Sequence, residues 1–317
     1  GTGSVHIFDR SVMVWTEQVV LTPMDGAVLD GFGSGVAFEG ETLIVGSPDH
    51  AHAGVAEGGA YVFVRSPGGV WAEEAELIAS DTALDDGFGW GVAVSGDLIV
   101  VGASYHDAGG MNAGAAYLFR GAGATWTEEA KLQASTPRPS DFFGRGVDVE
   151  GGRVVVGAPT NDLSDPFGFV YYFVGSGGVW SEEDSFQAAG GTFMDWFGGS
   201  VALDRGTVVV GAYLRDDLGP NSGAAFVFEC LDDPDEDPFP SGVFVNVTTT
   251  PAEDDTFKDG IESEASLLLP QALHDGQSSL RDSHRQRDHP RHDHPRDGYK
   301  HRNRAPEAHL KIQNLTG

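Results

Sequence analysis

A short motif returns four times along the first 230 residues. It consists of an Asp, one further residue and a Phe-Gly step, and its copies end at Phe32-Gly33, Phe88-Gly89, Phe143-Gly144 and Phe197-Gly198. The four Phe residues are separated by 56, 55 and 54 positions. A period of this length is typical of repeat proteins, in which each repeat is one supersecondary unit that buries its core only against its neighbours. The chain is therefore expected to fold as a series of like units.

Three further markers keep a nearly constant offset from the Phe-Gly step. An apolar run ends fourteen residues after each Phe, at Gly46, Gly102, Gly157 and Gly211. A second apolar run ends at Phe63, Phe119, Phe173 and Phe228. Seventeen residues before each Phe-Gly step stands a Trp, at Trp15, Trp71, Trp126 and Trp180. Because the apolar runs are rich in Val, Ile, Tyr and Phe and the segment after each Trp alternates, the pattern predicts four short strands in each unit.

The hydrophobic pattern differs among these four strands. The first strand alternates, as at Val92 and Val94, and a two-residue turn joins it to the second. The second and third strands are apolar at successive positions, which requires cover on both faces. The fourth strand alternates again, which is typical of an outermost, solvent-facing strand. In the second copy its predicted faces are Trp126, Glu128, Ala130 and Leu132 on one side, and Thr127, Glu129 and Lys131 on the other.

Units of about 55 residues with four strands each predict an all-β fold, a β-propeller of four-stranded blades. A β-sandwich would also contain many short strands, and it is the alternative fold. A sandwich gives no reason, however, for Trp, Phe-Gly and Gly markers at fixed offsets.

The combination of Phe-Gly with a later Gly-Ala-Pro resembles the FG-GAP repeats of integrin α-subunit propellers and their bacterial relatives. It is intact at Gly157-Ala158-Pro159 and nearly so at Gly46-Ser47-Pro48, and the resemblance covers residues 1–230. The resemblance implies that the Phe-Gly strand is innermost in each blade and the Trp strand outermost. It also implies a ring of seven blades, of which this chain holds an arc. The integrin calcium loop, Asp-x-Asp-x-Asp-Gly, is replaced here by FEGET, VSGDL, VEGGR and LDRGT, so the family's calcium sites are not expected.

Composition divides the chain into three parts. Residues 1–230, the expected propeller, hold 40 of the 45 Gly, and 31 acidic against 9 basic residues. Residues 231–269 hold 11 acids and one base and are expected to form an acidic linker. The alternative is that 243–249 supplies the fourth strand of the last blade. Residues 270–317 hold 7 of the 11 His and are expected to be a disordered, low-complexity tail. The alternatives are that this tail binds transition metals, or that its sequence is translated from an unintended reading frame.

The overall composition excludes several classes of protein. The 48 Asp and Glu against 19 Lys and Arg oppose binding of nucleic acid, and a single Cys excludes a disulfide scaffold. No apolar run reaches the length of a membrane span. The chain begins at Gly1 without Met or an apolar leader, so a signal lost or encoded upstream is expected. The predicted location is extracellular or in the cell envelope, in a secreted bacterial protein.

Strand order divides the loops between two faces of the propeller. Connections from the second to the third strand, and from the fourth strand to the next blade, emerge together on what we call the loop face. The loop face comprises 22–30, 47–58, 79–86, 103–113, 134–141, 158–167, 188–195 and 212–222. It holds 14 acids and only two Arg, whereas the opposite face holds 6 acids and 5 Arg. Such an imbalance favours a divalent metal or a basic patch on a partner, while solubility alone is the alternative reason for it.

Particular residues of the loop face follow from this reasoning. The candidate ligand residues are Asp49, Asp107, Asp162, Asp165, Asp216 and Asp217, and the weaker calcium candidates are Asp85, Asp86, Asp216 and Asp217. The Asp that opens each motif is instead predicted to bond the backbone of its own turn, at Asp30, Asp86, Asp141 and Asp195. His50 and His52 lie near Asp49 and could hold a metal, but as loop residues they are expected to be solvated.

Catalytic motifs do not stand out in the sequence. It has no nucleophile elbow, no phosphate-binding Gly loop and no pair of His at helical spacing, so no enzymatic activity and no cofactor are predicted. The leading hypothesis is a binding or adhesion module that presents acidic loops to a protein or glycan partner. The alternatives are a structural spacer of a larger surface protein, and a hydrolase or lyase on a propeller scaffold.

Overall fold

The computed structural model describes residues 2–11, 14–52, 54–160, 168–188, 190–192, 194–216 and 219–230, together with the strands at 244–248 and 264–266. The chain divides into two compact units, Gly1–Leu269 and Pro270–Gly317, and all the described residues belong to the first. Regular structure in the described part is entirely β. No helix there has the length and apolar character that a membrane crossing needs.

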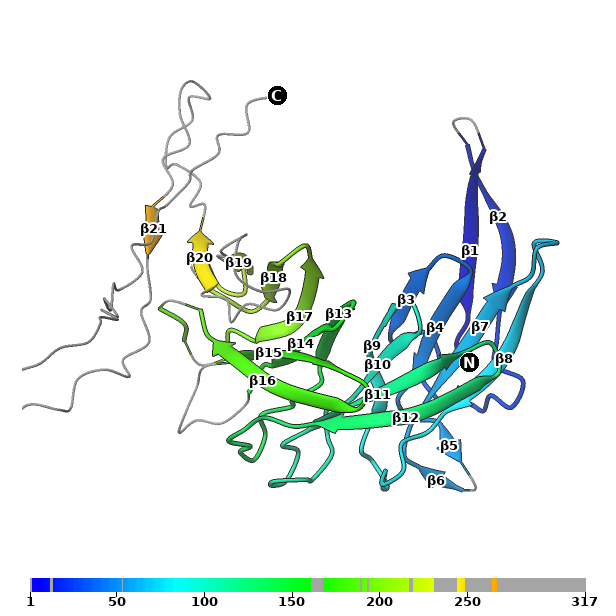
Figure 1. Cartoon of the computed structure of the whole chain (residues 1–317), viewed down its shortest axis with the longest axis horizontal. Helices are drawn as coiled ribbons and strands as arrows, with labels where there is room; N and C mark the ends of the chain where they lie inside the picture. The colour runs from blue at the N-terminus through cyan, green and yellow to red at the C-terminus, as the bar shows by residue number, and fades with distance from the viewer. Residues whose placement is uncertain are drawn as a thin grey trace, which may run out of the picture. The chain divides into compact units, whose positions relative to one another are not determined.

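Four antiparallel sheets follow one another along the described chain, one for each copy of the motif (Figure 1). Blade 1 contains β3 (Val36–Glu39), β4 (Thr42–Ser47), β7 (Gly59–Arg65) and β8 (Trp71–Leu77). Blade 2 contains β9 (Phe88–Ser95), β10 (Leu98–Ala103), β11 (Ala115–Ala122) and β12 (Thr125–Leu132). Blade 3 contains β13 (Gly146–Glu150), β14 (Arg153–Ala158), β15 (Phe169–Ser176) and β16 (Val179–Phe186). Blade 4 contains β17 (Phe197–Asp204), β18 (Thr207–Ala212) and β19 (Ala224–Cys230).

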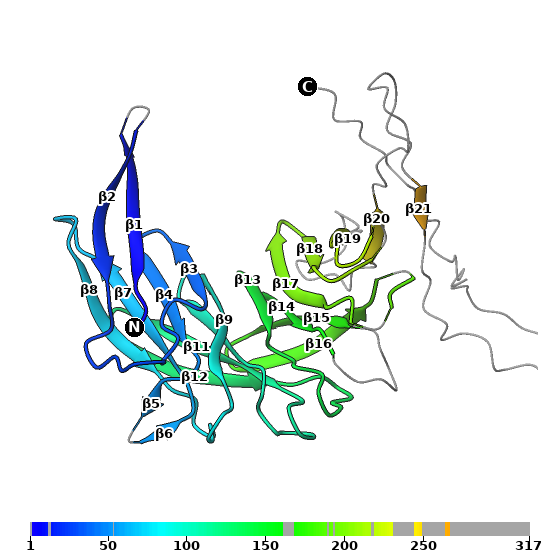
Figure 2. The same ribbon diagram turned by 180° about the vertical axis from the view of Figure 1, so that it is seen from behind.

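The remaining strands lie beside these sheets. β1 (Val5–Ser11) and β2 (Val14–Leu21) form a hairpin that corresponds to the third and fourth strands of a preceding blade, as Figure 2 shows from behind. β5 (Ala51–His52) and β6 (Val55–Ala56) form a small hairpin within the loop between β4 and β7. β20 (Phe244–Thr248) pairs antiparallel with β19, in the position of a fourth strand, and β21 (Glu264–Ser266) pairs with β20. Residues 231–269 are otherwise outside the described part of the chain, as is the tail at 270–317.

This arrangement confirms the predicted β-propeller architecture. Strand order within blades 1 to 3 runs from the Phe-Gly strand at one edge to the Trp strand at the other, and the Phe-Gly strands of adjacent blades contact each other. The second and third strands are buried along most of their length, as their apolar runs required. The closed seven-bladed ring stays a prediction, since the described residues form four blades and one hairpin.

Adjacent blades meet through glycine. In blades 1 to 3, the Gly near the end of the second strand lies against the Gly of the next blade's Phe-Gly step, so close that an added Cβ on Gly102 would lie 1.9 Å from the Gly144 carbonyl oxygen. Gly46 and Gly157 show the same spacing to the next blade. Only a residue without a side chain permits this approach of two backbones, which explains the Gly marker at Gly46, Gly102 and Gly157.

The hydrophobic core consists of successive interfaces between blades. One face of blade 2 buries Ile99, Tyr117 and Phe119 against blade 1, and its other face buries Val100 and Leu118 against blade 3. The Phe of each motif, such as Phe88, is fully buried and packs edge-on against two aromatic rings of the third strand of its own blade. Blades 1 to 3 are thus stabilised by the burial of both faces.

The predicted faces of the fourth strand were wrong. The pairing of β11 with β12 shifts by one residue at Leu118/Phe119, so that Phe119 is paired with Glu128 and Leu118 with Ala130. A β-bulge at Glu129 absorbs the extra residue and reverses the alternation beyond it. Lys131 therefore lies on the same face as Glu128 and Tyr117, not on the solvent side. Corresponding bulges occur in the β1–β2, β7–β8 and β15–β16 pairs.

The outer strands also tie each blade to a neighbouring loop. The carboxylate of Glu128 accepts hydrogen bonds from the backbone N–H and the hydroxyl of Ser80, at 2.7 and 2.9 Å. Glu182 accepts the same pair of bonds from Ser135. Glu129, at the bulge, accepts bonds from Arg120, from the backbone N–H of Gly178 and from the indole of Trp180 in the next blade.

Removing the charge of Glu129 is expected to weaken the contact between blades 2 and 3. Glu129→Gln should lower the free energy of unfolding by about 1–2 kcal/mol at neutral pH, because the buried carboxylate accepts three bonds. The bond from Arg120 holds the pKa of Glu129 below its ordinary value. A lowered folded-state pKa means that this stabilisation is complete above the ordinary Glu pKa of about 4.3 and is lost as the pH falls through the lower value.

Urea unfolding at several pH values measures this effect. The difference between wild type and Glu129→Gln should be largest near neutral pH and should shrink in acid. Glu74→Gln is the matched control, since Glu74 occupies the same repeat position but is exposed. An equal loss in both variants would contradict the role assigned to Glu129.

Candidate binding surface

The loop face begins at the turn that carries the motif. The Asp that opens the motif is buried, and its carboxylate accepts a hydrogen bond from the backbone N–H three residues earlier in each copy, as from Ala83 to Asp86 at 2.6 Å. The residue before this Asp has a positive φ in all four turns, at Leu29, Asp85, Ser140 and Met194. The side-chain bond holds the turn in this unfavourable backbone conformation.

A second repeated position faces the buried Asp. Twenty residues after the Asp, the loop that follows the second strand places a nitrogen-bearing side chain against it. His50 Nδ1 lies 2.9 Å from Asp30 Oδ2, His106 Nδ1 lies 3.4 Å from Asp86, and Arg215 Nη1 lies 3.4 Å from Asp195. All three side chains are buried. Asn161 holds this position in the third copy and lies outside the described residues.

The burial of His50 corrects the expectation that it is solvated. His50 is 4% exposed, whereas His52 is exposed as expected. The sequence did contain a signal, because His50, His106 and Arg215 share one offset from the motif, but a polar loop gives no indication of which side chains turn inward.

The predicted ligand residues are spread over the loop face. Asp49, Asp107 and Asp216 are exposed, and Asp162, Asp165 and Asp217 lie outside the described residues. Asp107 accepts the backbone N–H of Asn112, and Asp216 accepts that of Asn221, so both carboxylates stabilise their own loops. Burial, and then the charge of Asp85, raise the pKa of Asp49.

The predicted calcium ligands of the described residues, Asp85, Asp86 and Asp216, do not form one cluster. The Asp86 carboxylate is occupied by the Ala83 N–H and faces His106, while Asp85 and Asp216 belong to different blades. Calcium prefers six to eight oxygen ligands. Within the described residues, the calcium candidates of the sequence are not brought together.

A row of aromatic rings joins the loop-face segments 103–113 and 212–222 to residues beside the motif Phe of blades 2, 3 and 4. Trp90 contacts Tyr105, and Tyr105 contacts Phe142 of blade 3. Phe142 stacks on Trp196 of blade 4, and Trp196 contacts Tyr213. The centroids of successive rings lie 5.5 to 6.3 Å apart. Tyr105 and Tyr213 are 37% and 56% exposed. Sequence reasoning missed this row, because only Phe142 and Trp196 share a repeat position and the rings meet only when the blades pack.

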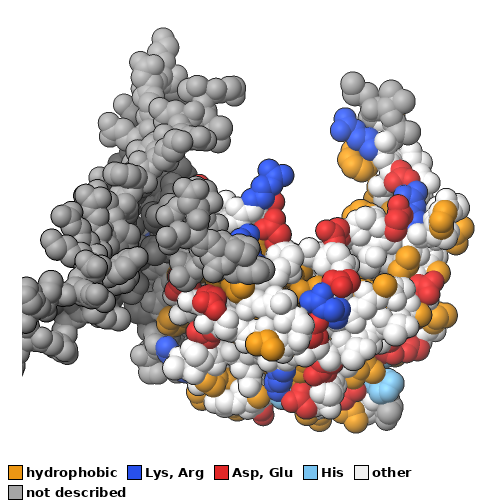
Figure 3. All heavy atoms as spheres, viewed as in Figure 1, with side chains coloured by type: hydrophobic (Ala, Val, Ile, Leu, Met, Phe, Trp, Pro, Cys, Tyr) orange, Lys and Arg blue, Asp and Glu red, His pale blue; other side chains and the backbone are white. Residues whose placement is uncertain are grey.

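The loop-face segments also carry exposed aliphatic and Met side chains. Residues at the tips of loop-face segments with large exposed side chains are Met24, Val28, Leu29, Leu84, Met111 and Met194. Figure 3 shows hydrophobic and acidic side chains next to one another along the lower edge of the molecule, where Figure 1 places the β5–β6 hairpin. Clusters of exposed aromatic and Met side chains with a polar rim are typical of protein interaction surfaces.

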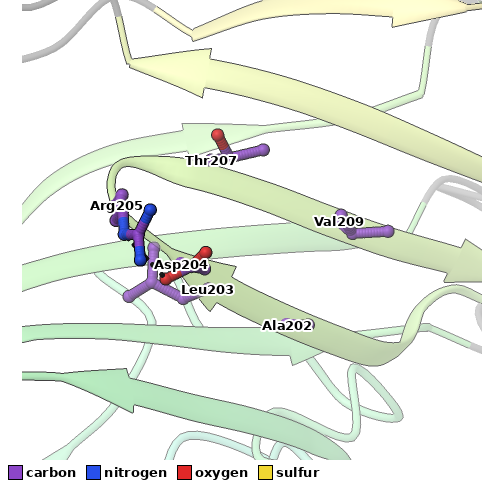
Figure 4. Close-up of a pocket in the computed structure, with 6 residues that line it drawn as sticks. All are labelled: Ala202, Leu203, Asp204, Arg205, Thr207 and Val209. Atoms are coloured by element: carbon purple, nitrogen blue, oxygen red, sulfur yellow. Dashed lines mark ion pairs between the residues drawn. The ribbon is translucent and has the colours of Figure 1, made fainter. Parts of the chain in front are cut away.

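Two other features of the described residues do not form a site. Ser4 Oγ, His6 and Glu17 are joined in series by hydrogen bonds of 3.2 and 3.1 Å, as in a catalytic triad. All three lie exposed on the open β1–β2 hairpin, without the enclosing pocket in which such a triad acts. A hollow of about 370 Å³ lies at the β17–β18 turn, away from the loop face, and is lined by Ala202, Leu203, Asp204, Arg205, Thr207 and Val209 (Figure 4).

The fold and this surface define a class: a β-propeller whose blades hold a rigid, partly apolar loop face. The chain belongs to the FG-GAP repeat family, whose model matches residues 15–63, 71–119, 126–173 and 180–228. The matched segments begin at the four Trp markers and end at the four Phe markers of the third strands. This match confirms the resemblance found in the sequence. No curated protein matches the chain.

Proposed function

We propose that the chain is a non-enzymatic binding or adhesion module that presents its loop face to a protein partner. The observation that carries this proposal is the row from Trp90 to Tyr213, together with the exposed apolar and acidic side chains of the loop-face segments. Aromatic and Met side chains contribute most to the energy of protein interfaces, and acidic side chains around them select partners with basic residues. FG-GAP propellers are typically non-catalytic, which is consistent with this role.

An extracellular or cell-envelope location in a secreted protein is part of the proposal. FG-GAP repeats occur mostly in extracellular proteins. The acidic composition suits a soluble domain that meets its partner outside the cell.

Replacing the exposed apolar residues of the loop face should abolish partner capture. The variant Leu84→Ser/Met111→Ser/Tyr213→Ser removes three side chains that are more than half exposed. Its stability should change little, because exposed positions contribute within about 0.5 kcal/mol each. We expect at least about tenfold weaker binding of the partner, and weaker binding by wild type at high salt.

Capture from a cell-surface extract, followed by titration with the identified partner, measures this loss. Val70→Ser/Val179→Ser is the control, since both residues are equally exposed on the opposite face. Retention of the same partner by the loop-face variant would contradict the proposal. Binding to a glycan array that the loop-face variant loses, without any retained protein, would assign the surface to a glycan instead.

A structural spacer is the second candidate function, and one observation favours it. Val209 of blade 4 is 40% exposed, whereas the corresponding Ile44, Val100 and Val155 of the other blades are 0% exposed. The face of blade 4 that bears Val209 therefore has the composition of a blade interface and suits packing against further β-structure. A spacer should retain no partner on its loop face in the capture experiment.

A further inference from the structure

Three ligand atoms converge where the loop after β2 meets blade 1. One ligand atom from each of Asp25, His50 and Glu76 lies within 4.8 Å of the other two. Nε2 of His50 is 3.3 Å from Oε1 of Glu76 and 3.7 Å from Oδ2 of Asp25. Glu76 Oε1 is buried without a hydrogen-bond partner, and the His50 side chain is 5% exposed. The cluster combines two carboxylates with an imidazole, and among the described residues no Lys or Arg forms an ion pair with Asp25 or Glu76.

A second layer of residues fixes the orientation of these ligands. Asp30 Oδ2 lies 2.9 Å from His50 Nδ1, and the same oxygen accepts the Ala27 N–H, so the ring proton belongs on Nδ1. Nε2 then directs its lone pair at the carboxylates. The phenol of Tyr61 donates a 2.9 Å hydrogen bond to Asp25 Oδ1, which leaves Oδ2 toward the cluster. A carboxylate behind the imidazole and a donor behind the ligating carboxylate are the usual supports of a metal ligand set.

Blade 2 contains the same arrangement of Asp, His and Tyr side chains, with the ammonium group of a Lys among them. Asp81, Asp86, His106 and Tyr117 stand 56 residues after Asp25, Asp30, His50 and Tyr61. Tyr117 donates to Asp81 as Tyr61 does to Asp25. At the position of Glu76, however, blade 2 has Lys131, whose Nζ lies 2.8 Å from Asp81 Oδ2 and 2.6 Å from His106 Nε2. A positive charge thus occupies the centre of this cluster in blade 2, and the blade 1 cluster offers a third ligand in its place.

The geometry points to a divalent transition-metal site of the zinc type, held by Asp25, His50 and Glu76. Bond lengths of 2.0–2.1 Å put neighbouring ligands of a tetrahedral zinc ion about 3.4 Å apart, close to the 3.3 and 3.7 Å observed. The imidazole favours zinc over calcium or magnesium, which prefer oxygen alone. The half-exposed Asp25 gives the ion access and leaves the fourth position to water. A bound ion would tie the loop after β2 to β8, across the junction between the N-terminal hairpin and blade 1.

Exchange of the two blades' central residues tests this site in the full chain. Zinc stoichiometry and thermal unfolding are measured for wild type, Glu76→Lys and Lys131→Glu. Glu76→Lys places an ammonium group where blade 2 has one, so it should bind one zinc ion fewer than wild type and lose the zinc-dependent rise in Tm. At zinc well above its dissociation constant this rise should be about 5–10 °C in wild type. Lys131→Glu should gain one ion.

The tail histidines are the same in all three proteins, so differences in stoichiometry report on the propeller. Tyr61→Phe should weaken zinc binding by about 10- to 100-fold, as loss of a supporting hydrogen bond does. Calcium in place of zinc should leave Tm unchanged. Equal stoichiometry in wild type and Glu76→Lys, or no zinc-dependent rise in the Tm of wild type, would overturn the proposal and would indicate that a proton on His50 Nε2 satisfies the carboxylates.

Discussion

Replacing Gly102 with alanine is expected to lower the free energy of unfolding by about 3 kcal/mol or more. The new Cβ would lie 1.9 Å from the Gly144 carbonyl oxygen and 2.7 Å from its carbonyl carbon. These are backbone atoms of the next blade's Phe-Gly step, so no side-chain rotation relieves the clash. Blades 2 and 3 would have to separate, and the packing of Val100 and Leu118 against blade 3 would be lost with them. Urea unfolding followed by tryptophan fluorescence measures the change.

Gly211→Ala is the matched control for this effect. Gly211 holds the same position in blade 4, but the nearest atom to its added Cβ is Oγ of Ser200, at 2.3 Å, on a side chain of the same blade that can rotate away. The expected loss is below about 1 kcal/mol. Equal destabilisation by the two substitutions would mean that Gly is needed within the strand itself, not at the contact between blades.

The repeat markers predicted the blades because they report directly on packing. Gly102 lies where the backbones of two blades meet, and Phe88 lies where aromatic rings pack within a blade. The distance in sequence between successive copies of such a residue therefore equals the length of one blade. The outer position of the Trp strand was predicted from its alternation, and the inner position of the Phe-Gly strand from the resemblance to FG-GAP repeats. Burial on both faces of β10 followed from its unbroken apolar run.

The bulge in the outer strands could not be predicted from alternation. Six steps lead from Trp126 to Leu132 on β12, whereas five lead from Gly121 to Ala116 on its partner β11. The extra residue becomes evident only when the two strands are paired, since the pattern of apolar and polar residues continues through it. The bulge also decides which side chains lie near His50. The corresponding bulge on β8 pairs Glu76 with Tyr61, so that the Glu76 carboxylate lies toward His50.

The acidic character of the loop face was found in the sequence, but its distribution was not. Counting charges treats every carboxylate alike, whereas Asp30 and Asp86 are buried in turns and Asp25 and Asp81 accept bonds from tyrosines. Many of the carboxylates that the sequence count treated as available to a partner therefore accept hydrogen bonds within the protein. What the described loop face offers to a partner is a smaller set of exposed acids around an aromatic row.

Replacing Asp195 with alanine is expected to cost about 3–5 kcal/mol, the range for removing one member of a buried ion pair. The Asp195 carboxylate accepts the backbone N–H and the hydroxyl of Thr192, and it faces the guanidinium of Arg215. The side chains of Asp195 and Arg215 are 6% and 10% exposed, so water cannot readily replace the lost charge. The motif turn would lose its bond to Thr192, and the charge of Arg215 would remain buried over the ring of Phe226.

A double-mutant cycle separates these two losses. Asp195→Ala/Arg215→Leu removes both charges, and it should be more stable than Asp195→Ala because the cost of a buried cation without its carboxylate disappears. The remaining deficit, about 1–2 kcal/mol, measures the turn itself. Asp216→Ala is the matched control, since its carboxylate also accepts a backbone N–H, from Asn221, but is exposed. If the double variant were no more stable than Asp195→Ala, the ion pair would contribute nothing, and the repeated Asp would act only through the backbone of its turn.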